Sequence, residues 1–160
     1  MLRPLIICLA LALAAGPAVA QQVAFGGIKA DTKAPVEVTA ESLQVQQADN
    51  TATFNGNVVI GQGAMRLTAD KVKVVYAQGD RGRIQSLDAT GNVTLVSGKD
   101  VAQAESGVYD VASGNVTLKG GVTLTQGQNI LTGETMQVNL ADGTANVSGR
   151  VRSILQPGGN

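Results

Sequence analysis

Apolar and polar residues alternate with a period of two along most of the chain after residue 35. In the segment 52–60, Ala52, Phe54, Val58 and Ile60 share one face, because successive side chains of a β-strand point to opposite sides. The opposite faces carry mostly Thr, Asn, Gln, Lys, Asp and Ser, which is typical of a sheet with one dry and one solvated face. After residue 20 no segment shows a convincing 3.6-residue stripe, so the pattern predicts an all-β fold.

Two further marks recur along this alternating pattern. Glycines interrupt strands at intervals of 35, 29 and 29 residues, and they are Gly56, Gly91, Gly120 and Gly149. Acidic residues begin the preceding strands at intervals of 29, 35 and 29 residues, and they are Glu41, Asp70, Glu105 and Glu134. Both marks indicate a repeat of about 30 residues, in which a strand with an acidic start is followed by a strand with a central glycine.

The repeated glycines have a structural interpretation and a functional one. A glycine inside a strand marks a bend, a bulge or a close approach of two backbones. Equivalent glycines at one level of successive strands predict that the sheet folds over itself into a sandwich or slender roll. Missing side chains on an inner face would also leave a trough that accepts an apolar ligand. Both interpretations are compatible with the pattern.

The alternation predicts the residues that line such a trough. They are the inward-facing members of the successive strands: Val58, Ile60, Val74, Val93, Leu118, Val122, Met136 and Val138. Most of them are Val or Leu, and aromatic residues make up only 2% of the chain. An interior of this kind suits aliphatic chains better than sugar rings, which stack on aromatic side chains.

The ends of the chain differ from its middle. Residues 1–20 have a basic start, an apolar run and the A-x-A pattern Ala18-Val19-Ala20, which predicts a cleaved secretory signal peptide. Cleavage would remove Cys8, the only cysteine, so the exported chain would contain no disulfide. We expect an irregular segment over 21–34, one β-domain over 35–155 and a flexible tail over 156–160.

Composition argues against most enzyme chemistry and against nucleic acid as a partner. The chain has no His, and without Cys8 no thiol, which excludes imidazole bases, His triads and thiolate metal sites. Without Arg3, 11 basic residues face 12 acidic ones, a net charge of −1, so no general basic field attracts nucleic acid. The recurring acidic residues could be read as calcium ligands or as a catalytic carboxylate pair, but solubilising charges at strand starts are the simpler reading. We therefore expect no catalytic residue, no metal and no cofactor.

One cluster of basic residues lies within a single repeat. It consists of Arg66, Lys71, Lys73, Arg81 and Arg83. The cluster can be a solvated strand face and turn, or a docking patch for phosphate groups or an acidic partner. The sequence leaves both possibilities open.

Three motifs give the chain a family resemblance. The segments PVEVTAESLQV and ATFNGNVVIGQGAMRLTADKVKV, with F-x-G-N-V, Q-G and A-D-K-V in order, resemble the OstA-like domain of LptA-type lipopolysaccharide transport proteins. The resemblance covers about residues 35–157. It implies a slightly twisted β-jelly roll that is open at both ends and holds lipid acyl chains inside.

The resemblance also implies site residues and partners. Val36 and Val38 match an apolar first strand near one end of the roll, and Phe54, Tyr109 and Val111 match interior, lipid-facing positions. The implied ligand is lipopolysaccharide, bound through its lipid A acyl chains. The implied partners are an LptC-type inner-membrane protein, an LptD-type outer-membrane protein and further copies of the chain, joined end to end in a periplasmic bridge.

Three rival functions remain at this stage. An LptC-like partner in the same route would normally keep an N-terminal membrane anchor. A secreted structural β-solenoid or adhesin fragment would have a filled, dry core, whereas a lipid carrier would have an accessible slot between two sheets. A glycan-active enzyme would need two facing carboxylates in a cleft.

Overall fold

The computed structural model describes residues 22–24 and 31–157, and these form one antiparallel β-sheet of 11 strands. The strands are β1 (Gln22–Ala24), β2 (Glu37–Thr39), β3 (Ser42–Gln46), β4 (Thr51–Gln62), β5 (Met65–Ala77), β6 (Asp80–Ser97), β7 (Asp100–Asp110), β8 (Asn115–Gln126), β9 (Asn129–Asn139), β10 (Thr144–Ser148) and β11 (Arg152–Ile154). The all-β prediction is confirmed. The proposed signal peptide lies outside the described residues.

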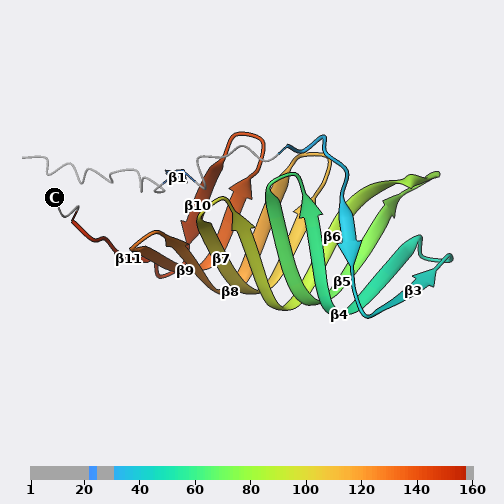
Figure 1. Cartoon of the computed structure of the whole chain (residues 1–160), viewed down its shortest axis with the longest axis horizontal. Helices are drawn as coiled ribbons and strands as arrows, with labels where there is room; N and C mark the ends of the chain where they lie inside the picture. The colour runs from blue at the N-terminus through green and yellow to red at the C-terminus, as the bar shows by residue number, and fades with distance from the viewer. Residues whose placement is uncertain (1–21, 25–30, 158–160) are drawn as a thin grey trace, which may run out of the picture.

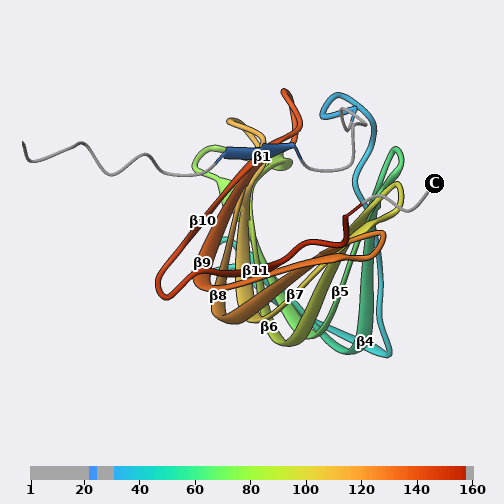
Figure 2. The same cartoon turned by 90° about the vertical axis from the view of Figure 1, so that its left-hand side faces the viewer.

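The strands β4 to β10 form a meander in which each strand pairs with the next one along the chain. Most of these strands are long and bend near their middle, so the single sheet curves into two facing walls (Figures 1 and 2). Wall A contains 58–69, 93–104 and 122–133, with β2 and β11 at its ends. Wall B contains 51–55, 71–90, 106–119 and 135–148, with β3 at one end and β1 at the other.

A β-bulge marks the bend in β4, β6 and β8, the long strands that carry the repeated glycines. Between Asn55 and Val58 the β4 chain advances by three residues while β5 advances by two, from Lys71 to Ala69. Gly56 lies in this extra stretch with a φ of 83°, a backbone conformation that glycine adopts at far lower cost than other residues. The equivalent register shifts in β6 and β8 fall at Gly91 and Gly120. The repeated glycines therefore bend the sheet at one level.

The acidic residues of the repeat lie directly over these glycines. A Cβ added to Gly91 would stand 2.5 Å from Oδ2 of Asp70, and Gly56, Gly120 and Gly149 face Glu41, Glu105 and Glu134 in the same way. The Asn92 side-chain amide donates a 2.8 Å hydrogen bond to that Asp70 oxygen, and Asn57 donates one of 2.6 Å to Glu41. The two repeat marks thus belong to one structural unit, which we call the acid–glycine corner.

The first and last bent strands are broken at their corners. β2 and β3 both pair with β4, on either side of Glu41, and the Glu41 N–H donates to the Gly56 carbonyl at 3.0 Å. β10 and β11 both pair with β9, and the Glu134 N–H donates to the Gly149 carbonyl at 3.0 Å. The short strand β1, within the segment expected to be irregular, pairs with β10 and so covers part of the last edge of wall B.

Candidate functional site

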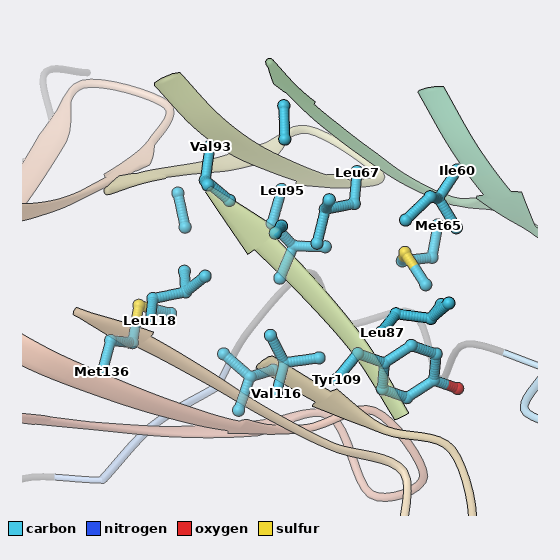
Figure 3. Packing of buried hydrophobic residues seen from close by; sticks show 14 of the residues in the cluster. Ile60, Met65, Leu67, Leu87, Val93, Leu95, Tyr109, Val116, Leu118 and Met136 are labelled. Carbon is cyan, nitrogen blue, oxygen red and sulfur yellow. The ribbon is translucent and has the colours of Figure 1, made fainter. Parts of the chain in front are cut away.

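The inward faces of the two walls form one continuous apolar cluster. Tyr109, Val116, Leu118 and Met136 come from wall B and face Ile60, Met65, Leu67 and Leu95 of wall A (Figure 3). Every residue that the sequence assigned to a lipid path points into this cluster. Those that are almost fully buried are Val58, Ile60, Val74, Val93, Tyr109, Leu118, Val122, Met136 and Val138, and those partly buried against them are Val36, Val38, Phe54 and Val111. Contact of these residues with lipid stays a prediction.

The middle of the interior is closed in this structure. Val58, Leu95, Leu118 and Met136 expose 0% of their surface, so no void the size of a water molecule adjoins them. From the sequence, we expected a lipid carrier to have an accessible slot between its two sheets and a structural solenoid to have a filled core. By that criterion alone the structure would favour the solenoid. A lipid could therefore occupy the interior only if the walls move apart.

One end of the roll leaves the apolar face uncovered. Leu43 and Val45 on β3 lie opposite Phe54 and Ala52 on β4, so they continue the inward face, yet they are 55% and 60% exposed. An open hollow of about 230 Å³ lies against them, lined by Leu43, Val45, Gln46, Gln47, Asn50, Thr51, Ala52 and Tyr76. The sequence did not single out Leu43 and Val45 as site residues. Leu43 and Val45 follow the same period-two alternation as the inward-facing residues, but only the strand order reveals that no further strand of the described residues covers them.

A buried polar contact joins the two walls near the ends of β4 and β7. The Tyr109 hydroxyl, from wall B, donates a 2.5 Å hydrogen bond to Oε1 of Gln62 at the end of wall A. Burial raises the pKa of the Tyr109 hydroxyl, against the lowering effect of the Gln62 bond and with a further rise from the Asp110 charge. The hydroxyl therefore stays protonated at neutral pH and acts as the donor. The sequence gave no signal for this pair, whose members are 47 positions apart.

The predicted role of the glycines needs one correction. Period-two alternation placed Gly56, Gly91, Gly120 and Gly149 on the buried face, as gaps in an apolar lining. Instead, the position that a Cβ would take on each of them faces the acidic residue of its corner, whose side chain is exposed. Positive φ angles at both the glycine and the following residue reverse the expected direction. Whether the bend itself shapes a lipid groove stays a prediction.

The basic residues with described side chains are spread over both walls. Arg66 lies on wall A, Lys71 at the corner and Lys73 on wall B, all exposed along β5. At about 3.3 Å per residue, Arg66 and Lys73 are separated by roughly 23 Å of strand that bends at the corner. Arg83 is exposed on β6, and the side chain of Arg81 lies outside the described residues. Docking of phosphate groups or an acidic partner at these residues stays a prediction.

The described residues offer neither a metal site nor a membrane-spanning helix. Among residues 22–24 and 31–157, no group of three or more His, Cys, Asp or Glu side chains could hold a metal ion. The same part of the chain contains no helix that is long and apolar enough to span a membrane. Each acid–glycine corner brings together one acidic residue and one glycine.

The architecture is a twisted, open-ended β-jelly roll with an apolar interior. Residues 37–144 match the family described as LptA/(LptD N-terminal domain) LPS transport protein. This match spans more than half of the 160 residues, and the chain belongs to that family. The resemblance found in the sequence is thereby confirmed, and membership of a lipopolysaccharide transport family outweighs the closed interior as a guide to function.

Similar proteins support this assignment. The chain is 29% identical over 141 residues to an uncharacterized protein of Rhizobium meliloti (strain 1021). This match covers 82% of this chain and 76% of that protein. It is 29% identical over 99 residues to the lipopolysaccharide export system protein LptA of Escherichia coli (strain K12), covering 58% of this chain. The chain matches about half (53%) of that protein's length.

A solved structure shares the fold. The crystal structure of LptH, the LptA homologous periplasmic component of the conserved lipopolysaccharide transport device from Pseudomonas aeruginosa, superposes with a TM-score of 0.68. The match covers 80% of this chain and 99% of that chain at 20% sequence identity, so it shows the fold alone. The jelly-roll prediction is confirmed by this likeness and by the strand topology.

Proposed function

We propose that this protein is a periplasmic carrier that moves lipopolysaccharide from the inner to the outer membrane and shields its acyl chains between walls A and B. The observation that carries the proposal is the continuous inward-facing apolar cluster, which runs through strands β4 to β10 of a chain from a lipopolysaccharide transport family. The similar proteins LptA and LptH belong to lipopolysaccharide export or transport systems. We expect a cleaved signal peptide over residues 1–20 to deliver the chain to the periplasm.

The lining suits an acyl chain that must pass through. Each buried methylene stabilises binding by about 0.8 kcal/mol, so leaving one long acyl chain in water costs on the order of 10 kcal/mol. The lining is built mainly of Val, Leu and Ala side chains at equivalent positions of successive strands. Such similar contacts favour shielding along the whole path over one deep binding site. No covalent step is required, so we expect no catalysis.

The ends of the roll supply the proposed joints to partners. Among the described residues, no further strand lies beyond β2 and β3 at one end, or beyond β1 and β11 at the other end. Unpaired strand edges accept strands from another chain. A contact between a first and a last edge is heterologous and builds open chains of copies. We propose that copies join head to tail, and that LptC-type and LptD-type proteins bind the two terminal edges.

Native mass spectrometry of the protein purified from its own periplasm tests the proposal. We expect a chain that begins at Gln21, carries masses corresponding to lipopolysaccharide, and is present partly as dimers and larger assemblies. The same chain expressed without residues 1–20, so that it stays in the cytoplasm, is the control and should carry no lipopolysaccharide. A periplasmic protein that contains only lipid-free chains would contradict the proposed function.

A further inference from the structure

The segment 31–36 crosses the open side of the roll and contacts the rims of both walls. Ala34 and Asp31 pack against Gly63, in the turn between β4 and β5 on wall A. Thr32 packs against Gly114, in the turn between β7 and β8 on wall B. In Figures 1 and 2 this blue segment, which begins at residue 31, lies along the side of the roll where the strand turns meet. We call residues 31–36 the strap.

Gln62 holds the strap to the interior through three side-chain hydrogen bonds. Its Nε2 donates to the carbonyl oxygens of Thr32 and Ala34, both at 3.0 Å, and its Oε1 accepts from the Tyr109 hydroxyl. Carbonyl oxygens can only accept, so the amide nitrogen of Gln62 must face the strap and its oxygen must face Tyr109. The side chain is 2% exposed, which makes each of these bonds costly to leave unmade. We call the Gln62–Tyr109 bond the latch.

The strap is shaped locally but has little apolar grip. The Asp31 carboxylate accepts the Lys33 N–H and the Asp31 carbonyl accepts the Ala34 N–H, both at 3.0 Å, which forms a compact turn. Three strap residues are half-buried: Thr32 and Ala34 beside the rims are small, and only Val36, next to β2, packs against the apolar cluster. A segment with few buried apolar contacts opens at lower free energy than the strands beneath it.

We propose that the strap and its latch form a gate, so that the interior accepts an apolar chain only when residues 31–36 lift away and the Gln62–Tyr109 bond breaks. This inference rests on the proposed carrier function, because the closed interior must open for an acyl chain to enter. Breaking the latch frees Tyr109 of wall B from Gln62 of wall A, which allows the walls to separate. The strap therefore controls both access to the interior and the distance between the two walls.

A disulfide across the strap tests the gate. The Cγ2 atom of Thr32 lies 3.3 Å from the position that a Cβ on Gly114 would take, which is within the reach of a disulfide. In the mature chain, which has no other cysteine, the double variant Thr32→Cys/Gly114→Cys should close the gate when oxidised and release it when reduced. Uptake of N-phenyl-1-naphthylamine, a neutral fluorophore that brightens in apolar surroundings, reports access. We expect oxidation to slow uptake by at least about tenfold, and the reduced protein is its own control.

A second pair of variants tests the latch by itself. Tyr109→Phe removes the donor hydroxyl and keeps the ring, so uptake should become about two- to tenfold faster, the effect expected for one hydrogen bond. Thr117→Val, which removes a hydroxyl from a half-buried residue on the outer face of β8, should behave like the unmodified protein. Circular dichroism checks that each variant is folded, and the disulfide pair decides the question if Tyr109→Phe does not fold.

The outcomes separate the gate from the carrier function. Equal uptake by the oxidised and reduced double variant would overturn the gate, as would Tyr109→Phe and Thr117→Val behaving alike. Repeating the measurement with purified lipopolysaccharide distinguishes the two proposals. Lipopolysaccharide binding that ignores the disulfide leaves the carrier function standing without the gate. Disulfide-sensitive uptake of the fluorophore without any lipopolysaccharide binding supports the gate and contradicts the carrier function.

Discussion

Replacing Gly91 by valine is expected to lower the free energy of unfolding by about 2–3 kcal/mol. The backbone at Gly91 has a φ of 81°, which a β-branched residue adopts only with strain. The new Cβ would also displace the Asp70 carboxylate from its hydrogen bond with Asn92. Because the corner bends the sheet, a folded variant should also bind less lipid. Urea titration followed by circular dichroism measures the stability change.

A second glycine provides a matched control, and a double variant separates the loss due to backbone strain from the loss due to the carboxylate. Gly61→Val lies in the same sheet, with no left-handed φ and with nothing within 4 Å of its new Cβ, and should change stability little. Combining Gly91→Val with Asp70→Ala should recover the part of the loss due to the carboxylate, while the backbone strain remains. If Gly91→Val and Gly61→Val were equally stable, the corner would not depend on glycine.

Removing residues 146–160 is expected to convert head-to-tail oligomers into monomers. The deletion takes away β11, the last edge of wall A, and the end of β10, with which β1 pairs at the last edge of wall B. The inward-facing cluster of β4 to β9 remains, so the truncated chain should stay folded and bind lipid but fail to complete a bridge. Sedimentation velocity over a broad concentration range measures assembly directly.

A shorter truncation provides the control for this experiment. Deleting residues 156–160 leaves Arg152–Ile154 paired with β9, and should not change the sedimentation profile. Full-length protein that stays monomeric at all concentrations would contradict head-to-tail assembly. A 146–160 deletion that assembles as well as the full chain would instead move the joint away from the C-terminal edge.

The sequence predicted the sheet and its two faces well, because burial imposes a period of two on each strand. Leu118, Val122 and Met136, assigned to the interior from alternation, are all almost fully buried. The recurring acidic and glycine positions also predicted the repeat. Their meaning required the register, since Asp70 and Gly91 come together only when β5 and β6 pair in three dimensions.

Other features depend on contacts between distant segments and left no periodic trace. Gln62 reads as an ordinary polar residue at a strand end, yet it is buried between Tyr109 and the strap. The exposure of Leu43 and Val45 follows from the absence of a strand beyond β3 among the described residues, which local pattern cannot reveal. The direction of Gly56 was wrong because a left-handed backbone reverses the alternation on which the prediction depended.

The central claim is that acyl chains lie between the two walls, and photocrosslinking inside and outside the roll tests it most directly. A photoreactive phenylalanine analogue fits best at Phe54 and Tyr109, which are aromatic and face inward. The matched outward positions are Lys73 and Val108, which lie next to inward-facing residues of β5 and β7 and are exposed. In cells, we expect Phe54 and Tyr109 to capture lipopolysaccharide and Lys73 and Val108 to capture none. Equal capture from both faces, or capture from the outward positions alone, would contradict the account.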